Sequence, residues 1–190
     1  MLNRSFISLI GLSVALTVPN LSYAQSTKAP AMATETSSAK TVLNSEYVMT
    51  VRVNLLVRPV TDTLRVIEVT SGQVNGPKIK GRVVAPSGDW LRVLPSGVAE
   101  LDVRILIETD DGALIYGSYK GVLKASPESN ERLNKGELLK TDELYLMGAP
   151  KFETKAPNYA WLNEIQTVSK MVEFQRVGDP HFTYDVFAVR

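Results

Sequence analysis

The stretch between Val98 and Lys124 constrains the fold most, because it predicts a β-hairpin. Residues 99–109 alternate between an apolar and a polar face, a period of two that is typical of a β-strand. The apolar face carries Ala99, Leu101, Val103, Ile105 and Ile107. The other face carries Glu100, Asp102, Arg104 and Glu108, interrupted by Leu106. Asp111-Gly112 separates this run from a second one, which indicates a two-residue turn between antiparallel strands.

Short runs of the same kind continue along the chain, and clusters of Pro, Gly, Ser and Asn separate them. We expect further strands at residues 46–58, 64–70, 78–84, 90–94, 142–153, 165–176 and 182–189. Pro86-Ser87-Gly88 is predicted to be a loop. One helix is predicted at 126–136, where Ser126 is a suitable N-cap. About eight short strands favour an all-β antiparallel sandwich or barrel. A barrel has no free edges, and its interior could hold one small ligand.

The N-terminal residues 1–24 have the features of a secretory signal peptide. Arg4 precedes an apolar run, and small residues follow at the expected cleavage site before Gln25. We therefore expect a periplasmic or secreted protein. Residues 25–44 are rich in Ser, Thr and Ala and lack aromatic residues, which predicts a flexible leader. The barrel domain would then extend over residues 45–190.

Composition narrows the classes of function. Signal cleavage would remove one of the 21 basic residues and none of the 20 acidic ones, which leaves a formal charge of zero. A neutral chain has no electrostatic basis for binding nucleic acid or, after cleavage, an anionic membrane. The sequence contains no cysteine, so disulfides, thiolate catalysis and cysteine-ligated metals are excluded. The oligomeric state is left open.

No standard catalytic motif occurs in the chain, neither a P-loop, a dinucleotide-binding glycine motif, a nucleophile elbow nor a His-Glu-x-x-His zinc motif. The single histidine, His181, follows Asp179-Pro180, and we interpret it as a solvated turn residue. The polar face of residues 99–109 has two interpretations. It is either a solvent-facing strand or an inward row in which Arg104 holds a ligand carboxylate or enolate. The pattern alone favours the solvent-facing strand. Four aromatic residues fit a ligand pocket or ordinary packing equally well: Trp90, Tyr145, Tyr159 and Trp161.

Several short motifs occur in order between Tyr47 and the C-terminus. They are Gly81-Arg82, Asp89-Trp90, residues 97–104, residues 109–116, residues 150–153 and residues 159–163. Together they resemble domain-of-unknown-function family 3237, an uncharacterised bacterial protein family. The resemblance implies a single antiparallel β-barrel similar to allene oxide cyclase and lipocalin-like barrels. It implies no general activity, although some fungal relatives in polyketide pathways are described as isomerases.

The resemblance also gives weight to particular residues. Polar positions that recur on one strand in the family favour the inward orientation of Asp102 and Arg104, and we adopt that expectation. The implied catalytic residues are Asp102, Arg104, Tyr116 and Glu153. The implied ligand-binding residues are Arg82, Trp90, Tyr159, Trp161 and Asn163, and the aromatic pocket suggested above adds Tyr145. Arg104 would hold a developing oxyanion, Asp102 or Glu153 would act as base, and Tyr116 as acid.

We therefore expect an exported barrel that binds a small aromatic or polyketide-like molecule in its interior. It would act as an isomerase or lyase that uses no cofactor and no metal. The alternatives are a non-catalytic ligand carrier and a structural or partner-binding domain.

Overall fold

The structure is a computed structural model that describes residues 41–190. The predicted signal peptide and residues 25–40 of the predicted leader lie outside the described residues. Residues 41–44 have no regular secondary structure, and the first strand begins at Ser45.

The domain is a closed antiparallel β-barrel of eight strands with two short extra strands, which confirms the predicted fold class. The strands are β1 (Ser45–Pro59), β2 (Leu64–Asn75), β3 (Lys80–Val93), β4 (Ala99–Thr109), β5 (Leu114–Lys124), β6 (Leu139–Lys140), β7 (Tyr145–Gly148), β8 (Lys151–Glu153), β9 (Gln166–Gln175) and β10 (His181–Val189). The helices are α1 (Pro127–Asn134) and the 3-10 helix η1 (Pro157–Glu164). The order around the barrel is β10-β1-β2-β3-β4-β5-β7-β9, and the pairing of β9 with β10 closes it. The extra strands β6 and β8 pair with β9 and β5.

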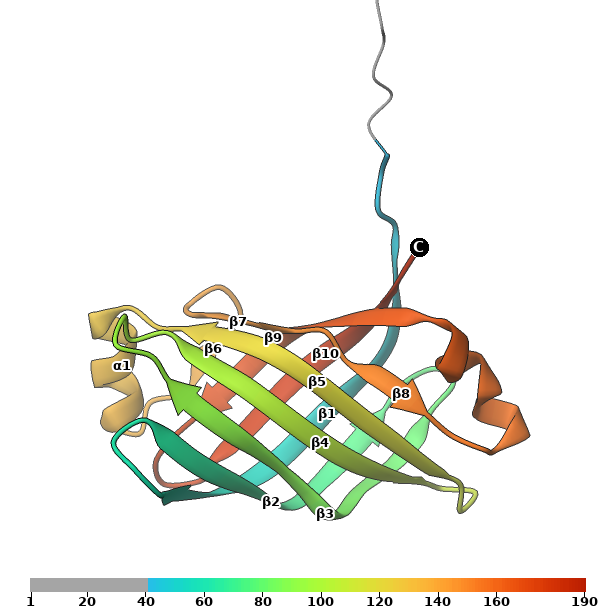
Figure 1. Cartoon of the computed structure of the whole chain (residues 1–190), viewed down its shortest axis with the longest axis horizontal. Coiled ribbons are helices and arrows are strands. Elements are labelled where there is room, and N and C mark those ends of the chain that lie inside the picture. The colour runs from blue at the N-terminus through green and yellow to red at the C-terminus, as the bar shows by residue number, and fades with distance from the viewer. Residues whose placement is uncertain (1–40) are drawn as a thin grey trace, which may run out of the picture. The chain divides into compact units, whose positions relative to one another are not determined.

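The two helices lie at opposite ends of the barrel (Figure 1). α1 lies at the end where β9 turns into β10, and Arg176 of that turn donates hydrogen bonds to Asn130 and Asn134 of the helix. η1 lies at the end with the β4–β5 turn, where the Tyr159 hydroxyl donates to Asp111. Below, the two parts of the barrel interior are called the α1 half and the η1 half.

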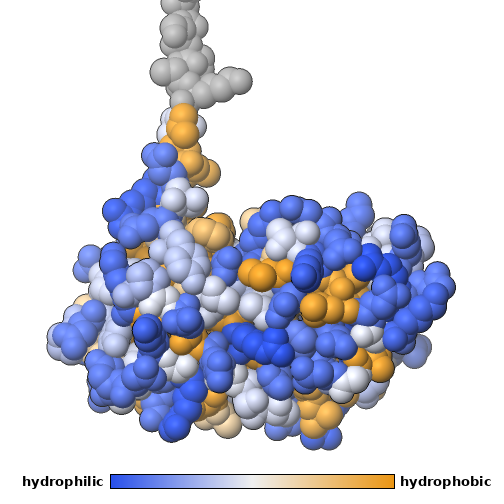
Figure 2. Space-filling view, turned by 180° about the vertical axis from the view of Figure 1, so that it is seen from behind, coloured by the Kyte–Doolittle hydropathy of each residue, from blue (hydrophilic) through white to orange (hydrophobic). Residues whose placement is uncertain are grey.

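The η1 half is tightly packed with apolar side chains. Five of its residues have exposed fractions of at most 1%, namely Met49, Ile79, Ile107, Ile115 and Leu162. Burying such a side chain contributes about 1.5–3 kcal/mol to folding, so this half provides much of the core. The outer surface is mostly hydrophilic, and on the face seen in Figure 2 hydrophobic residues form small, separate patches.

The α1 half is less completely filled. Its inward-facing side chains include Ile67, Leu91, Tyr119, Leu123 and Phe174, all of which remain partly exposed. An inward side chain keeps an exposed area only if a space of at least the size of a water molecule lies beside it. Tyr119, Leu123 and Phe174 pack against the buried core, and all five side chains keep part of their surface accessible, unlike the fully buried side chains of the η1 half.

The predicted loop at Pro86-Ser87-Gly88 is wrong, because β3 runs through it without interruption. The register between β3 and β4 shifts at this point, between Val84 and Gly88. The Ser87 hydroxyl accepts the Leu106 N–H at 2.9 Å and donates to the Val84 carbonyl at 2.7 Å. The side chain thus supplies a partner that the shifted register removes from the main chain, and one long strand replaces two short ones.

The β4–β5 turn contains three residues, not the two that were predicted. Thr109 donates its N–H to the Ala113 carbonyl, and Gly112 donates to the Thr109 carbonyl. Gly112 has φ of +84°, the conformation of the last residue in a three-residue hairpin loop. Two further differences are that the predicted strand 142–153 is divided into β7 and β8, and that residues 157–164 form η1, which the sequence did not indicate.

Candidate functional site

β4 places Asp102 and Arg104 on the outside of the barrel, so the prediction that they face inward is wrong. The Asp102 side chain is 30% exposed and the Arg104 side chain 46%. Leu101, Val103 and Ile105 alternate with them along the strand and are buried. Burying the aliphatic side chains of β4 stabilises the fold, whereas burying the ionised side chains of Asp102 and Arg104 would cost free energy. The solvent-facing interpretation of the pattern is the correct one.

Four of the predicted residues nevertheless meet in one groove on the outer face of β3, β4, β5 and β7. The groove has a volume of about 930 Å³, and its lining includes Trp90, Asp102, Arg104 and Tyr145. Asp102 pairs with two cations, Arg104 Nη1 at 2.5 Å and Lys120 Nζ at 2.7 Å. The Arg104 guanidinium lies 5.5 Å from the centre of the Trp90 ring.

The Lys120 hydrogen bond, with a further contribution from Arg104, holds the pKa of Asp102 below its ordinary value. A carboxylate of this kind stays ionised and paired, and it is a poor proton acceptor near neutral pH. The groove can therefore bind a ligand against its aromatic rings and charged groups, but Asp102 does not have the properties of a general base.

Three other predicted residues lie elsewhere on the outer surface. Tyr116 and Glu153 are direct neighbours across β5 and β8, and both are exposed. Arg82 forms an ion pair with Glu108 at 3.0 Å and lines a second groove of about 520 Å³. The structure does not bring these residues together with Asp102, so the four predicted catalytic residues do not form one site.

The remaining predicted residues, Tyr159, Trp161 and Asn163, belong to η1. The Tyr159 hydroxyl donates to Asp111 at 3.0 Å, and Lys78 Nζ lies 5.4 Å from the centre of the Trp161 ring. Asn163 accepts the N–H of Thr154 at 2.9 Å and donates to its carbonyl at 3.0 Å. These contacts attach η1 to the end of the barrel, and a role in ligand binding stays a prediction.

A carboxyl group that was not predicted as a site residue lies inside the wall of the α1 half. Asp89 of β3 pairs with Ile67 and Val103, which places it on the inner face. It is only 8% exposed, and its Oδ1 accepts the main-chain N–H of Asp102 at 2.8 Å. Burial raises the pKa of Asp89 to about 6, because desolvation outweighs the hydrogen bond from Asp102 and the charge of Lys120.

Tyr119 is a neighbour of Asp89 on the inner face, and Tyr184 lies beside Tyr119. Tyr119 pairs with Val103, as Asp89 does, and its ring centre is 6.2 Å from that of Tyr184. Burial raises the pKa of Tyr184 to about 12, and burial also raises the pKa of Tyr119, with further contributions from Tyr184 and from the charge of Asp89. Both hydroxyls therefore stay protonated near neutral pH, and because Tyr119 interacts with the Tyr184 hydroxyl, Tyr184 is the one that can donate a hydrogen bond to a ligand oxygen.

An aromatic row continues from the tyrosines. The Tyr184 ring stacks on Phe182 with centres 5.3 Å apart, and Phe182 meets Phe174 edge-on at 6.0 Å. Together with Asp89 these rings give the α1 half one acid–base group beside a surface suited to a flat apolar ligand.

Part of this inner site had a signal in the sequence. The apolar alternation of residues 182–188 includes Tyr184 on its inner face, so its inward direction could have been predicted. Asp89 had no such signal, because the expected loop at 86–88 broke the alternation of β3 just before it. The interpretation of His181 as a solvated residue is also wrong. It is the first residue of β10, it is 4% exposed, and its Nδ1 lies 2.7 Å from the Asp179 carbonyl oxygen.

The sequence of this chain matches a known protein family. Residues 43–189 match the family described as "Protein of unknown function (DUF3237)". The chain belongs to this family. The UPF0311 protein RPA1785 of Rhodopseudomonas palustris is 34% identical over 102 residues, which are 54% of this chain and 67% of that protein. The crystal structure of RPA1785 covers 80% of this chain and 99% of its own, with a TM-score of 0.72 and 28% identity.

Two other solved structures of similar fold extend the comparison. A beta-barrel like protein from Acinetobacter baumannii has a TM-score of 0.63 and 30% identity, covering 80% of this chain and 99% of that chain. An enzyme from Penicillium herquei has a TM-score of 0.56 and 18% identity over 80% of this chain and 98% of its own, a likeness of fold alone. The family predicted from the motifs is thus confirmed.

Within residues 41–190, no helix has the length and apolar character needed to cross a membrane.

Proposed function

We propose that the α1 half of the barrel binds a small aromatic or polyketide-like carbonyl compound and moves a proton on it, which makes the protein a cofactor-independent isomerase. The observation that supports this is the position of Asp89, a buried carboxyl group with a pKa of about 6 beside Tyr119, whose ring neighbours that of Tyr184. A general base is most effective when its pKa lies near the working pH.

The geometry gives each group a role. The Asp89 carboxylate accepts a proton from a carbon next to the ligand carbonyl, and the electron pair of that C–H bond moves to the carbonyl oxygen. Tyr184 stays protonated and donates a hydrogen bond to the resulting enolate oxygen, and Tyr119 supports the Tyr184 hydroxyl. Asp89 then returns the proton to a different carbon, so the product is an isomer and no atom is gained or lost.

The test is proton exchange in deuterated water, followed by NMR, with acetophenone and para-acetylbenzoate as probes. Wild type should accelerate exchange of the methyl protons, and Asp89→Asn should slow it about 100-fold or more, as expected for loss of a general base. Asp110→Asn changes an exposed carboxylate in the β4–β5 turn and should leave exchange unaltered. Exchange by Asp89→Asn at the wild-type rate would exclude the proposed base.

A non-catalytic carrier is the second candidate, and the partly exposed inner side chains of the α1 half favour it, since a carrier needs only space. If wild type exchanges neither probe faster than buffer, the isomerase is excluded. Mass spectrometry of small molecules that co-purify with the native protein then tests the carrier.

The proposal also includes export. The signal sequence supports a mature periplasmic or secreted protein that begins at Gln25. N-terminal sequencing of the protein from the periplasmic fraction tests this, and a protein that starts at Met1 in the membrane fraction would contradict it.

A further inference from the structure

Arg65 is a charged residue on the inner face of the barrel. It pairs with Pro59 of β1 and Leu91 of β3 and shares its face with Ile67, whereas the neighbouring Leu64 pairs with Arg92 on the outer face. Asp89, which pairs with Ile67, is therefore its diagonal neighbour on β3. Diagonal neighbours of this kind are about 7–8 Å apart, a distance that one small substituted ring can span.

Arg65 is half-buried, and one nitrogen of its guanidinium lacks a partner. Its Nη1 is buried and has no hydrogen-bond acceptor in the part of the chain that the structure describes. Nor does Arg65 take part in any of the ion pairs formed among residues 41–190. Arginine does not lose its proton in proteins, so it cannot escape this position by becoming neutral. A buried cationic N–H group without an acceptor costs free energy, which an anion at this position would recover.

A second arginine lies at the same end of the barrel, because the end of β1 meets the β9–β10 turn, where Leu55 donates its N–H to the Pro180 carbonyl. Arg176 follows β9, and its guanidinium lies 6.0 Å from the centre of the Phe174 ring, at the end of the aromatic row. Its Nη1 donates to Asn134 at 2.8 Å and its Nη2 to Asn130 at 3.1 Å, both on α1. Burial, together with the positive charge of Arg65, lowers the pKa of Arg176. Its partners are neutral amides, so they orient the guanidinium without balancing its charge.

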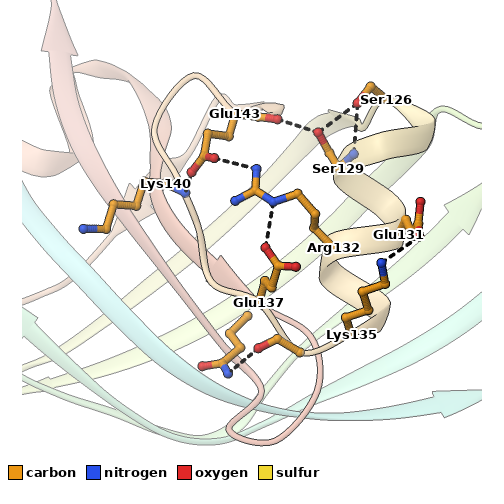
Figure 3. Close-up of polar contacts among 10 residues, drawn as sticks. Ser126, Ser129, Glu131, Arg132, Lys135, Glu137, Lys140 and Glu143 are labelled. Atoms are coloured by element: carbon orange, nitrogen blue, oxygen red, sulfur yellow. Dashed lines mark hydrogen bonds and ion pairs between the residues drawn. The ribbon is translucent and has the colours of Figure 1, made fainter.

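Arg132 on α1 differs from Arg65 and Arg176 because carboxylates pair with its guanidinium. Arg132 donates to Glu137 at 2.8 Å and to Glu143 at 2.7 Å, so two carboxylates balance its charge (Figure 3). The same contacts, with the Ser126 N-cap, hold α1 in place beside the barrel (Figure 3). Arg65 and Arg176 are half-buried as Arg132 is, but neither forms an ion pair with a carboxylate within residues 41–190.

We propose that Arg65 and Arg176 form an oxyanion-binding subsite at the α1 end of the barrel interior, which holds the carboxylate or phosphate of a small aromatic ligand. The planar guanidinium groups suit such an anion because they donate two parallel hydrogen bonds to it. The apolar body of the ligand would lie against Phe174 and Phe182. That the other end of the same ligand reaches Asp89 rests on the function proposed above. The substrate class is accordingly an aromatic acid or aryl phosphate.

The test is calorimetric titration of the full domain with benzoate, phenyl phosphate and neutral benzamide. Wild type should bind at least one of the two anions tenfold or more tightly than benzamide. Arg65→Met and Arg176→Met should each lose this preference. Arg58→Met is the matched control, because Arg58 lies on the same β1–β2 hairpin, is exposed and pairs with Glu68 on the outer face. Preference for benzoate or for phenyl phosphate identifies which oxyanion the subsite takes.

A thermal melt without ligand separates this role from a structural one. Because Arg65 is half-buried and its Nη1 has no acceptor among the described residues, Arg65→Met should have a raised melting temperature, whereas loss of a structural arginine would lower it. Equal binding of benzamide and both anions by wild type, or unchanged anion preference in both arginine variants, would overturn the subsite. Asp89→Asn should keep the anion preference, so failure of the proton exchange and failure of the subsite are distinguishable.

Discussion

Replacing Asp89 by asparagine tests the electrostatics of the interior without any ligand. The asparagine side chain keeps an oxygen that can accept the Asp102 N–H, which Asp89 Oδ1 accepts at 2.8 Å. The shape of the side chain is also preserved. The substitution therefore removes one property, the ability to ionise, at a position that is 8% exposed.

The expected size follows from the pKa of Asp89, which is about 6 in the folded protein against an ordinary value of 3.8. This difference corresponds to about 3 kcal/mol. Because the folded state holds the proton more tightly, wild type loses stability as the pH rises from 3.8 to about 6. Below that window the cost is absent, and above it the cost is complete. The difference in free energy of unfolding between Asp89→Asn and wild type should therefore change by about 3 kcal/mol in favour of the variant from acid to neutral pH.

The measurement is urea unfolding of both proteins across this pH range. Asp111→Asn is an informative comparison, because the Thr109 hydroxyl, with Tyr159, lowers the pKa of Asp111. The stability that Asp111 adds is present above its ordinary pKa and is lost as the pH falls, so its variant should show the opposite trend. A constant difference between wild type and Asp89→Asn at all pH values would refute the argument that Asp89 is buried in ionised form.

Three further substitutions test other parts of the structure by thermal or urea unfolding. Gly112→Val should cost about 1 kcal/mol or more through its φ of +84° alone, since no atom lies within 4 Å of the added Cβ, and an unchanged stability would contradict the turn. Arg104→Leu should cost only about 0–1 kcal/mol, because Asp102 keeps Lys120 at 2.7 Å; a loss of about 3 kcal/mol or more, typical of a broken buried pair, would contradict its outward position. Ser126→Ala should cost about 1 kcal/mol by removing the oxygen that accepts the Ser129 N–H at 3.0 Å, and full retention of stability would show that α1 does not depend on its cap.

The fold was predictable because local patterns in this chain agree with the tertiary structure. Residues 99–109 alternate in the sequence and form β4 with the same alternation of burial. Ser126 and Pro127 predicted the start of α1 correctly. The pattern of β3 failed because its register shift depends on the Ser87 hydroxyl, whose partner Leu106 lies on another strand. No local rule foresees a contact of that kind.

The candidate site was less predictable, because a charged residue is conspicuous in a sequence whichever face it occupies. Asp102 and Arg104 form a polar row in the sequence, but they lie on the outer face, where solvent and ion pairs stabilise their charges. Arg65 stands in a run with Val66, Ile67 and Val69, where the alternation points it inward. A charge on the apolar face of a strand was therefore the more informative signal.

Asp102 and Lys120 on the outer face of the barrel are connected to Asp89 in its interior through the main chain of β4. Asp102 turns its side chain outward to Lys120 while its main-chain N–H donates to the carboxyl group of Asp89. The charge of Asp102 raises the pKa of Asp89 and the charge of Lys120 lowers it, although burial is the largest cause. Because the barrel wall is a single layer of strands, charges on its outer surface act on the buried carboxyl group of Asp89 without contacting it. For that reason the properties of Asp89 depend on both faces of β4, and neither face of the strand explains them alone.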